Sequence, residues 1–250
     1  MASRKQPTAA ETDMTSPYGL EIIENCSECT CMKSEFFCGV SREVLQSLNH
    51  VSYKNTLPAG AILFVEGQAP RGMFIVCSGK VNLSTTSRDG KNLILKTAQA
   101  GEAIGLAAAI SGMPYETTAE TATPCQLNFV DRKHFMELMA THSEIGVHTA
   151  QHLSRDYQTA YRDLHGLVLT RSSEGKLARL LLSQARGSEM DTAAPCRTAP
   201  MTHEEMAQRI GSSRETVTRL LATLRRRQLI RLDGPGLVIR DRIRLEALTV

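Results

Sequence analysis

The chain contains, from Met201 to Leu221, the stretch MTHEEMAQRIGSSRETVTRLL. Thr202 and Glu205 have the spacing of a capping box at the start of one helix, and Gly211 can supply the turn that ends it. A second helix is predicted to begin at Ser212. Its apolar side chains recur at helical spacing, so one of its faces should be buried: Val217, Leu220, Leu221 and Leu224. The stretch therefore predicts two helices joined by a glycine turn.

The opposite face of the second helix carries polar side chains: Ser213, Arg214, Glu215, Thr218 and Arg219. Arginine can donate two hydrogen bonds to guanine, and a carboxylate can accept one from the amino group of cytosine. Glu215 also has the spacing of a capping partner for Ser212. Two apolar runs, 229–231 and 237–240, flank a DGPG turn and predict a hairpin after the helix. Together these features predict a winged helix-turn-helix that binds double-stranded DNA.

The charge is distributed in keeping with that prediction. The 250-residue chain has a net charge of only +3, but seven arginines and a single acid, Glu215, lie between Arg209 and Arg231. No apolar run approaches the roughly 18 residues that a membrane span needs, and the first residues have no signal-peptide pattern. We therefore expect a cytoplasmic protein without membrane contact. We also expect no enzyme activity, because the chain shows no phosphate loop, paired-carboxylate site or Ser-His-Asp order.

The middle of the chain has the sequence pattern of an all-β region. Between Val51 and Val130, short apolar runs alternate with glycines, which predicts a β-sandwich, jelly roll or barrel. The expected strands lie at 61–64, 73–76, 81–83, 93–95 and 126–129. A short helix is expected at 41–48, ahead of the first strand. A polar loop is expected at 187–200, between a helix around 177–182 and the helix-turn-helix.

Helical periodicity dominates residues 144–170. One narrow seam on this helix recurs at steps of three and four residues: Ala150, Leu153, Tyr157, Ala160, Leu164 and Leu167. A stripe of this kind favours a dimerisation helix over one that only packs on its own domain. The overall expectation is an α+β chain with four parts: a disordered leader (1–18), a sensor domain (19–140), a dimerisation helix (141–170) and a winged helix-turn-helix domain (171–250).

The segment GSSRETVTRLL, from Gly211 to Leu221, closely resembles the recognition helix of the Crp/Fnr superfamily, which includes the cyclic-AMP receptor protein and the fumarate-nitrate reductase regulator. LPAGAILF at 57–64 and MFIVCSGKV at 73–81 look like the β-roll of that family, a jelly roll of the cyclic-nucleotide-binding type. The resemblance spans about residues 20–245. It implies a homodimer whose two recognition helices enter successive major grooves of a palindromic operator, with RNA polymerase as a further partner. Arg214, Glu215 and Arg219 match the cyclic-AMP receptor type, which implies half-sites close to TGTGA.

Cysteines provide the second strong signal. Four of the seven fall within thirteen residues: Cys26, Cys29, Cys31 and Cys38. Clustering of this kind indicates a metal or redox site, because disulfides are uncommon in the cytoplasm. A zinc site of four thiolates is one interpretation. A catalytic CxxC pair is rejected, because such pairs accompany a βαβ unit.

The oxygen-sensing subgroup of the family implies a more specific site. There, three N-terminal cysteines and one cysteine just before a late β-roll strand hold a [4Fe–4S] cluster, and four thiolates are the usual ligands. By this resemblance the ligands here are Cys26, Cys29, Cys38 and Cys125, with Cys31 as an alternative to Cys26. The last gap in the N-terminal run is longer than in the best-known oxygen sensors. Zinc is the rival cofactor.

The cyclic-nucleotide subgroup implies a different effector. Gly101 and Glu102 match its Gly-Glu pair, but Tyr115 and Glu116 stand where an Arg-Ser pair would hold the cyclic phosphate. A carboxylate at that place repels a phosphate, so this effector is the less favoured alternative.

The remaining candidate ligands are expected to have ordinary roles. Cys77 is expected to be a small buried side chain and Cys196 to be incidental. The pair His148 and His152 is expected to lie solvated on a helix surface.

Overall fold

The computed structural model describes residues 17–20, 22–23, 39–170, 172–186, 196–234 and 236–249. Cys26, Cys29, Cys31 and Cys38 lie outside the described residues. Within the long helix, the side chains of 163 and 165–169 are also outside them. Among the described helices, none combines the length and apolar character that crossing a bilayer requires.

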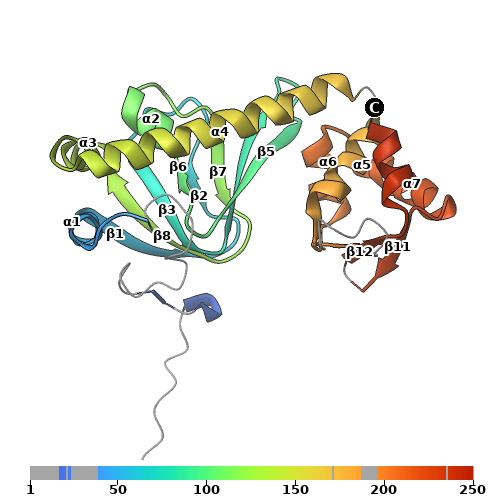
Figure 1. Ribbon diagram of the computed structural model, residues 1–250, viewed down its shortest axis with the longest axis horizontal. Coiled ribbons are helices and arrows are strands. Elements are labelled where there is room, and N and C mark those ends of the chain that lie inside the picture. The colour runs from blue at the N-terminus through green and yellow to red at the C-terminus, as the bar shows by residue number, and fades with distance from the viewer. Residues whose placement is uncertain are drawn as a thin grey trace, which may run out of the picture.

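The first part of the chain is a β-sandwich of two four-stranded sheets (Figure 1). One sheet has the order β1-β8-β3-β6 and the other β2-β7-β4-β5. The strands are β1 (Ser52–Leu57), β2 (Ile62–Phe64), β3 (Gly72–Ser78), β4 (Lys80–Thr86), β5 (Asn92–Gln99), β6 (Ala103–Ile104), β7 (Thr118–Thr121) and β8 (Cys125–Asp131). All five expected strands are present, most of them longer than expected. Strand β1 forms one edge of the first sheet, where it pairs with β8, a strand far from it in sequence.

Two cores hold the sandwich. One lies between the sheets and includes Val76, Val81 and Leu127. The other lies between the β3–β8 side and the helices, and includes Leu48, Phe135 and Ile145. The covering helices are α1 (Arg42–Val51), α2 (Leu106–Ser111), α3 (Arg132–Thr141) and the long α4 (Ser143–Leu169). A 3-10 turn, η1 (Pro17–Gly19), is the first described element.

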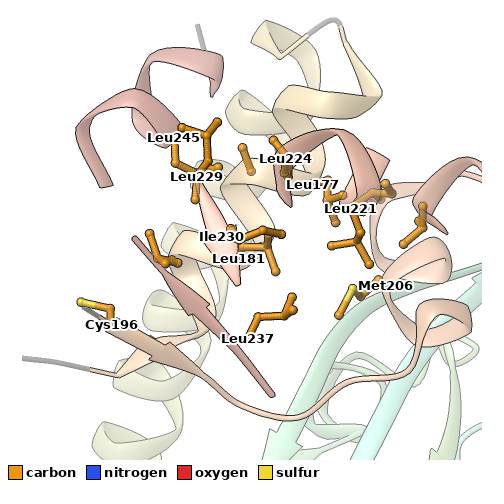
Figure 2. Packing of buried hydrophobic residues seen from close by; sticks show 14 of the residues in the cluster. Leu177, Leu181, Cys196, Met206, Leu221, Leu224, Leu229, Ile230, Leu237 and Leu245 are labelled. Atoms are coloured by element: carbon orange, nitrogen blue, oxygen red, sulfur yellow. The ribbon is translucent and has the colours of Figure 1, made fainter. Parts of the chain in front are cut away.

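The last part of the chain packs helices on a small antiparallel sheet of order β11-β12-β10-β9. Its elements are α5 (Ser173–Gln184), β9 (Ala185–Arg186), β10 (Cys196–Thr198), α6 (His203–Ile210), α7 (Arg214–Arg226), β11 (Ile230–Asp233), β12 (Gly236–Ile239), α8 (Arg242–Glu246) and η3 (Ala247–Thr249). Leu177, Leu181, Leu224 and Leu229 are fully buried between them, and Figure 2 shows these side chains converging from α5, α7 and the segment before β11.

Strand β10 corrects two expectations. Residues 196–198 were expected in a polar loop, but they pair with β12 and β9. Cys196 is only 3% exposed and belongs to the core, so it is not incidental. With its two inward side chains, Cys196 and Thr198, the strand is too short for an alternating pattern to stand out in the sequence.

Among the described residues, the two parts touch beside β5 as well as through the α4 connection. Helix α6 packs near β5. There the Arg209 side chain donates a hydrogen bond to Oγ1 of Thr97, which in turn donates to Oδ1 of Asn82 at 2.7 Å. Helix α4 runs along the sandwich and ends beside the C-terminal helices (Figure 1).

Candidate DNA-recognition surface and sensor site

The N-terminus of α7 is fixed by a cap. Oγ of Ser213 accepts a hydrogen bond from the backbone N–H of Thr216 at 3.2 Å. Ser213 is therefore the cap residue, and the expectation that Ser212 caps α7 is wrong. The shift by one residue also removes the proposed capping box between Ser212 and Glu215. The glycine turn before it is as expected, since Gly211 has a φ of 64° and ends α6.

The polar face of α7 is open to solvent. Ser213, Arg214, Glu215, Thr218 and Arg219 are all exposed, while Val217, Leu221 and Leu224 are buried behind them. Hydrogen bonds from the Glu215 backbone N–H and from Ser213 lower the pKa of the Glu215 carboxyl, so it is ionised at neutral pH. An exposed helix face carrying guanidinium and carboxylate groups has the chemistry needed to contact base edges in a major groove.

Residues at the start of α6, the first helix of the helix-turn-helix, support the exposed face of α7. Oγ1 of Thr202 accepts from the backbone N–H of Glu205 at 3.1 Å, which confirms the cap predicted for α6. Nδ1 of His203, at the start of α6, lies 2.9 Å from Oγ1 of Thr218, so α6 helps to position the exposed side of α7. Sequence patterns did not indicate this contact, because it joins residues on two different helices.

The expected dimer seam divides into two parts. Leu153 is half-buried against the sandwich core. Ala150, Tyr157, Ala160 and Leu164 are exposed, with Tyr157 70% and Leu164 55% accessible. Leu167 lies where side chains are not described. Tyr161 adds to the exposed side, since its ring stacks on that of Tyr157 with centroids 6.2 Å apart. Among the residues that the structure describes, the C-terminal half of α4 thus presents an apolar surface that no other element covers.

Cys125 is the one expected cluster ligand within the described residues. It is fully buried at the start of β8, and its Sγ lies 3.2 Å from the carbonyl oxygen of Lys80 and 3.1 Å from that of Thr123. Burial raises the pKa of the Cys125 thiol. Two carbonyl acceptors and burial favour the protonated form, whereas metal ligation requires the thiolate. In the described part of the chain, no group of three or more His, Cys, Asp or Glu side chains is placed to hold a metal.

A second contact brings the N-terminal segment to the same strand. Gln126, next to Cys125, is only 1% exposed. Its side-chain amide accepts from the Ile23 backbone N–H at 2.8 Å and donates to the Ile23 carbonyl oxygen at 2.7 Å. Cys26 follows Ile23 by three residues, a span of at most about 10 Å of extended chain. The role of Gln126 was missed, because a single polar residue in a strand carries no signal of a distant partner.

The positions that correspond to the nucleotide contacts of the cyclic-nucleotide subgroup are engaged within the protein. Glu102 forms an ion pair with Nζ of Lys96 at 2.8 Å and accepts from the Gln99 backbone N–H at 2.7 Å. Lys96 also pairs with Asp156 of α4 at 2.7 Å. Glu102 is therefore part of a bridge between the sandwich and the long helix.

Tyr115 occupies the interior of the sandwich. It is 3% exposed, its ring stacks on Phe64 with centroids 3.9 Å apart, and its hydroxyl donates to the Gly72 carbonyl oxygen at 2.6 Å. Glu116, the next residue, is exposed. Neither side chain provides the cationic contact that a cyclic phosphate needs.

His152 corrects a further expectation. It is 3% exposed rather than solvated, and its Nε2 lies 3.3 Å from the Ala103 carbonyl oxygen and 3.4 Å from Oδ2 of Asp156. Burial lowers the pKa of His152, although Asp156 opposes the shift. The pair with His148 looked like a surface feature because the helix is long and partly exposed. Cys77, by contrast, is buried as expected.

Two family models match the chain. A cyclic nucleotide-binding domain matches residues 54–142, and a Crp-like helix-turn-helix domain matches residues 175–248. The second match contains α6, α7 and the hairpin β11–β12.

Individual relatives agree with this pair of domains. The chain is 28% identical over 214 residues to a CRP-like cAMP-activated global transcriptional regulator of Mycobacterium tuberculosis, covering 85% of this chain and 95% of that protein. It is 27% identical to the cAMP-activated global transcriptional regulator CRP of Pasteurella multocida, covering 73% and 87%.

Solved structures show the same fold. A CRP/FNR family transcriptional regulator from Thermus thermophilus has a TM-score of 0.62 at 26% identity, covering 79% of this chain and 98% of that one. The c-di-GMP responsive regulator CLP of Xanthomonas campestris has a TM-score of 0.69 at 20% identity, covering 80% and 99%. From its two matched domains, their order and their structure, the chain belongs to the Crp/Fnr family of DNA-binding transcription regulators, which are not enzymes.

Proposed function

We propose that this regulator is a homodimer that recognises a palindromic operator through α7, and that a redox-sensitive [4Fe–4S] cluster held by Cys26, Cys29, Cys38 and Cys125 controls its DNA binding. The observation that carries the cluster proposal is the pair of hydrogen bonds between Gln126 and Ile23. They tie the segment that leads into the cysteine run to the strand that contains Cys125. When bound, such a cluster supplies sensitivity to oxygen or to redox poise.

The buried, hydrogen-bonded thiol of Cys125 has to change its state before it can bind a cluster. Its thiol must lose a proton and turn away from the carbonyl oxygens of Lys80 and Thr123 before it can act as a ligand. Gly79 packs directly on Cys125, and a Cβ built there would lie 2.5 Å from the sulfur. Loading is therefore expected to coincide with a rearrangement of the turn between β3 and β4. Cys31 stays an alternative to Cys26.

Dimerisation through α4 is supported by the half of this helix that no other described residues cover. Tyr157, Tyr161 and Leu164 are each more than half exposed, an unfavourable arrangement for large apolar side chains unless a partner covers them. A second copy of α4 offers the same surface, which is the condition for a twofold interface. RNA polymerase is the further partner that we propose, and TGTGA-like half-sites are the proposed targets of Arg214, Glu215 and Arg219.

A cyclic nucleotide is the second candidate effector, because the relatives from Mycobacterium tuberculosis and Pasteurella multocida are named as cAMP-activated. The engagement of Glu102 by Lys96 and the packing of Tyr115 in the core argue against it. A zinc or thiol redox site on the same cysteines is the third candidate, since it needs no change in the ligand set.

Anaerobic purification separates these candidates. The cluster proposal expects brown protein containing iron and sulfide, with colour lost in Cys38→Ser and Cys125→Ser but kept in the control Cys77→Ser. Stoichiometric zinc without iron would support the zinc site and contradict the cluster. A colourless protein whose operator affinity rises on addition of cyclic AMP would support the nucleotide instead.

A further inference from the structure

Four arginines gather around a hollow at the C-terminal end of α7. The hollow has a volume of about 670 Å³, and its lining consists of Ala222, Arg225, Arg226, Gln228, Ile230, Arg231, Leu232 and Arg240. The guanidinium-bearing residues come from the last turn of α7, from β11 and from the residue after β12. All four are exposed, and the lining contains no acidic side chain.

The arginines around this hollow have no counter-charge among the residues that the structure describes. Three other arginines of the same domain, which do not line the hollow, form ion pairs: Arg227 with Glu174 at 2.7 Å, Arg242 with Glu246 at 2.8 Å, and Arg197 with Asp233. Within the described residues, none of the four lining arginines forms an ion pair or a side-chain hydrogen bond that neutralises it. Like charges held close together repel one another, so a hollow built this way is suited to an anionic partner.

The hollow continues the exposed face of α7. Glu215, Thr218, Ala222 and Arg225 follow one another at steps of three or four residues, so they lie on the same side of the helix. Arg225 lies seven residues beyond Thr218, a distance of about 10 Å along the axis. A partner lying against the N-terminal half of this face therefore reaches the basic hollow without a change of direction.

We infer that the hollow binds the phosphodiester backbone of the same duplex that the N-terminal end of α7 contacts, an inference that rests on the proposed use of α7 in operator recognition. Guanidinium groups bind phosphates through two parallel hydrogen bonds, and phosphates are alike whatever the base sequence. The hollow thus adds affinity without adding sequence preference. Arg214 and Arg219 supply the preference, and the arginines of the hollow hold the DNA in register.

The test uses Arg226→Ala/Arg231→Ala in the full-length protein, with Arg227→Ala/Arg197→Ala as a control that removes the same charge from paired positions. Affinity for the operator and for a random duplex is measured across a range of salt concentrations. Each phosphate contact contributes about 0.9 to the steepness of the plot of log affinity against log salt. The double substitution removes two such contacts in each protomer of the dimer, so the hollow variant should reduce the steepness by about 3.6 on both duplexes. The ratio of the two affinities should stay unchanged, and the control should keep the wild-type slope.

Ethylation interference identifies the contacted phosphates. For at least one phosphate, ethylation should prevent DNA binding by the wild-type protein but have no effect on binding by the hollow variant. The control should give the wild-type pattern. An unchanged salt dependence together with an unchanged interference pattern would overturn the inference. The partner of the hollow would then be an acidic protein segment or a small anion. A lowered affinity ratio would also overturn it, because the arginines would then contribute to base discrimination. Failure of the wild-type protein to bind any operator would instead contradict the proposed function.

Discussion

The DNA-binding domain and the β-sandwich draw their candidate functional residues from very different sequence distances. The proposed recognition face of α7 comes from one run, Ser213 to Arg219, which a single helix and one serine cap present to solvent. The sandwich combines residues from separate segments: Ile23 is hydrogen-bonded to Gln126, and Lys96 joins Glu102 to Asp156. Sequence patterns therefore determine the first site closely, whereas only the fold brings the second together.

The dimer surface offers the largest expected effect. Leu164→Asp places a charge on each side of the proposed α4 interface, and burying such charges costs several kcal/mol, so the association constant should fall by about a thousandfold or more. Sedimentation should then show monomers that occupy single half-sites. Gln158→Asp puts the same charge on the same helix at an exposed polar position and should leave the dimer intact. A Leu164→Asp protein that stays dimeric would move the interface away from α4.

A core substitution tests whether the DNA-binding domain and the β-sandwich unfold independently. Leu224 is fully buried in the core that Figure 2 shows, so Leu224→Ala should destabilise the DNA-binding domain by about 2–5 kcal/mol. The contact between Arg209 and Thr97 is small, and the sandwich should keep its stability. Hydrogen exchange followed by mass spectrometry should show loss of protection in peptides of 173–249 and not in those of 52–131. Equal loss in both would mean that the chain unfolds as one unit.

Base recognition gives an intermediate effect. Arg214→Ala should weaken binding to the specific operator by about 1–3 kcal/mol and relax the preference at one base pair of each half-site. Competition binding with operators altered at single positions measures both. If affinity for random DNA falls by the same factor, Arg214 contacts phosphate and not a base.

The bridge between sandwich and α4 gives the smallest effect. Because burial lowers the pKa of His152, the folded state favours the neutral imidazole and the unfolded state takes up a proton more readily. Stability should therefore fall as the pH drops below the ordinary value of 6.5 and through the lowered pKa. Lys96, Arg155 and Asp156 face this group, and their charges persist in His152→Gln.

Urea unfolding at about pH 7.5 and about pH 5.5, on either side of the ordinary histidine pKa, measures the difference. The acid-induced loss should be smaller in His152→Gln than in the wild-type protein. An identical loss in both would show that other groups account for it.

Much of the fold followed from local patterns. The cap that Thr202 places on the backbone N–H of Glu205, the turn at Gly211 and the apolar runs of the sandwich all depend on neighbours in sequence. The Glu205 side chain does not complete the expected capping box, because it pairs with Arg209. The errors have the opposite character. Ser212 was predicted to cap α7, but the adjacent Ser213 has the same capping chemistry and is the residue that does so. Cys196 and His152 looked polar in their local context, although distant segments bury them. The hydrogen bond from Arg209 to Thr97 carried no sequence signal either.

The most direct test of the account compares operator affinity before and after air, in protein purified without oxygen. We predict that the anaerobic wild-type dimer binds its operator tightly and that binding weakens as the colour is lost. Cys125→Ser should bind weakly and equally in both conditions, while Cys77→Ser should follow the wild type. Wild-type protein that binds its operator equally well before and after air would contradict control by the cysteine cluster and leave only the DNA-binding part of the account.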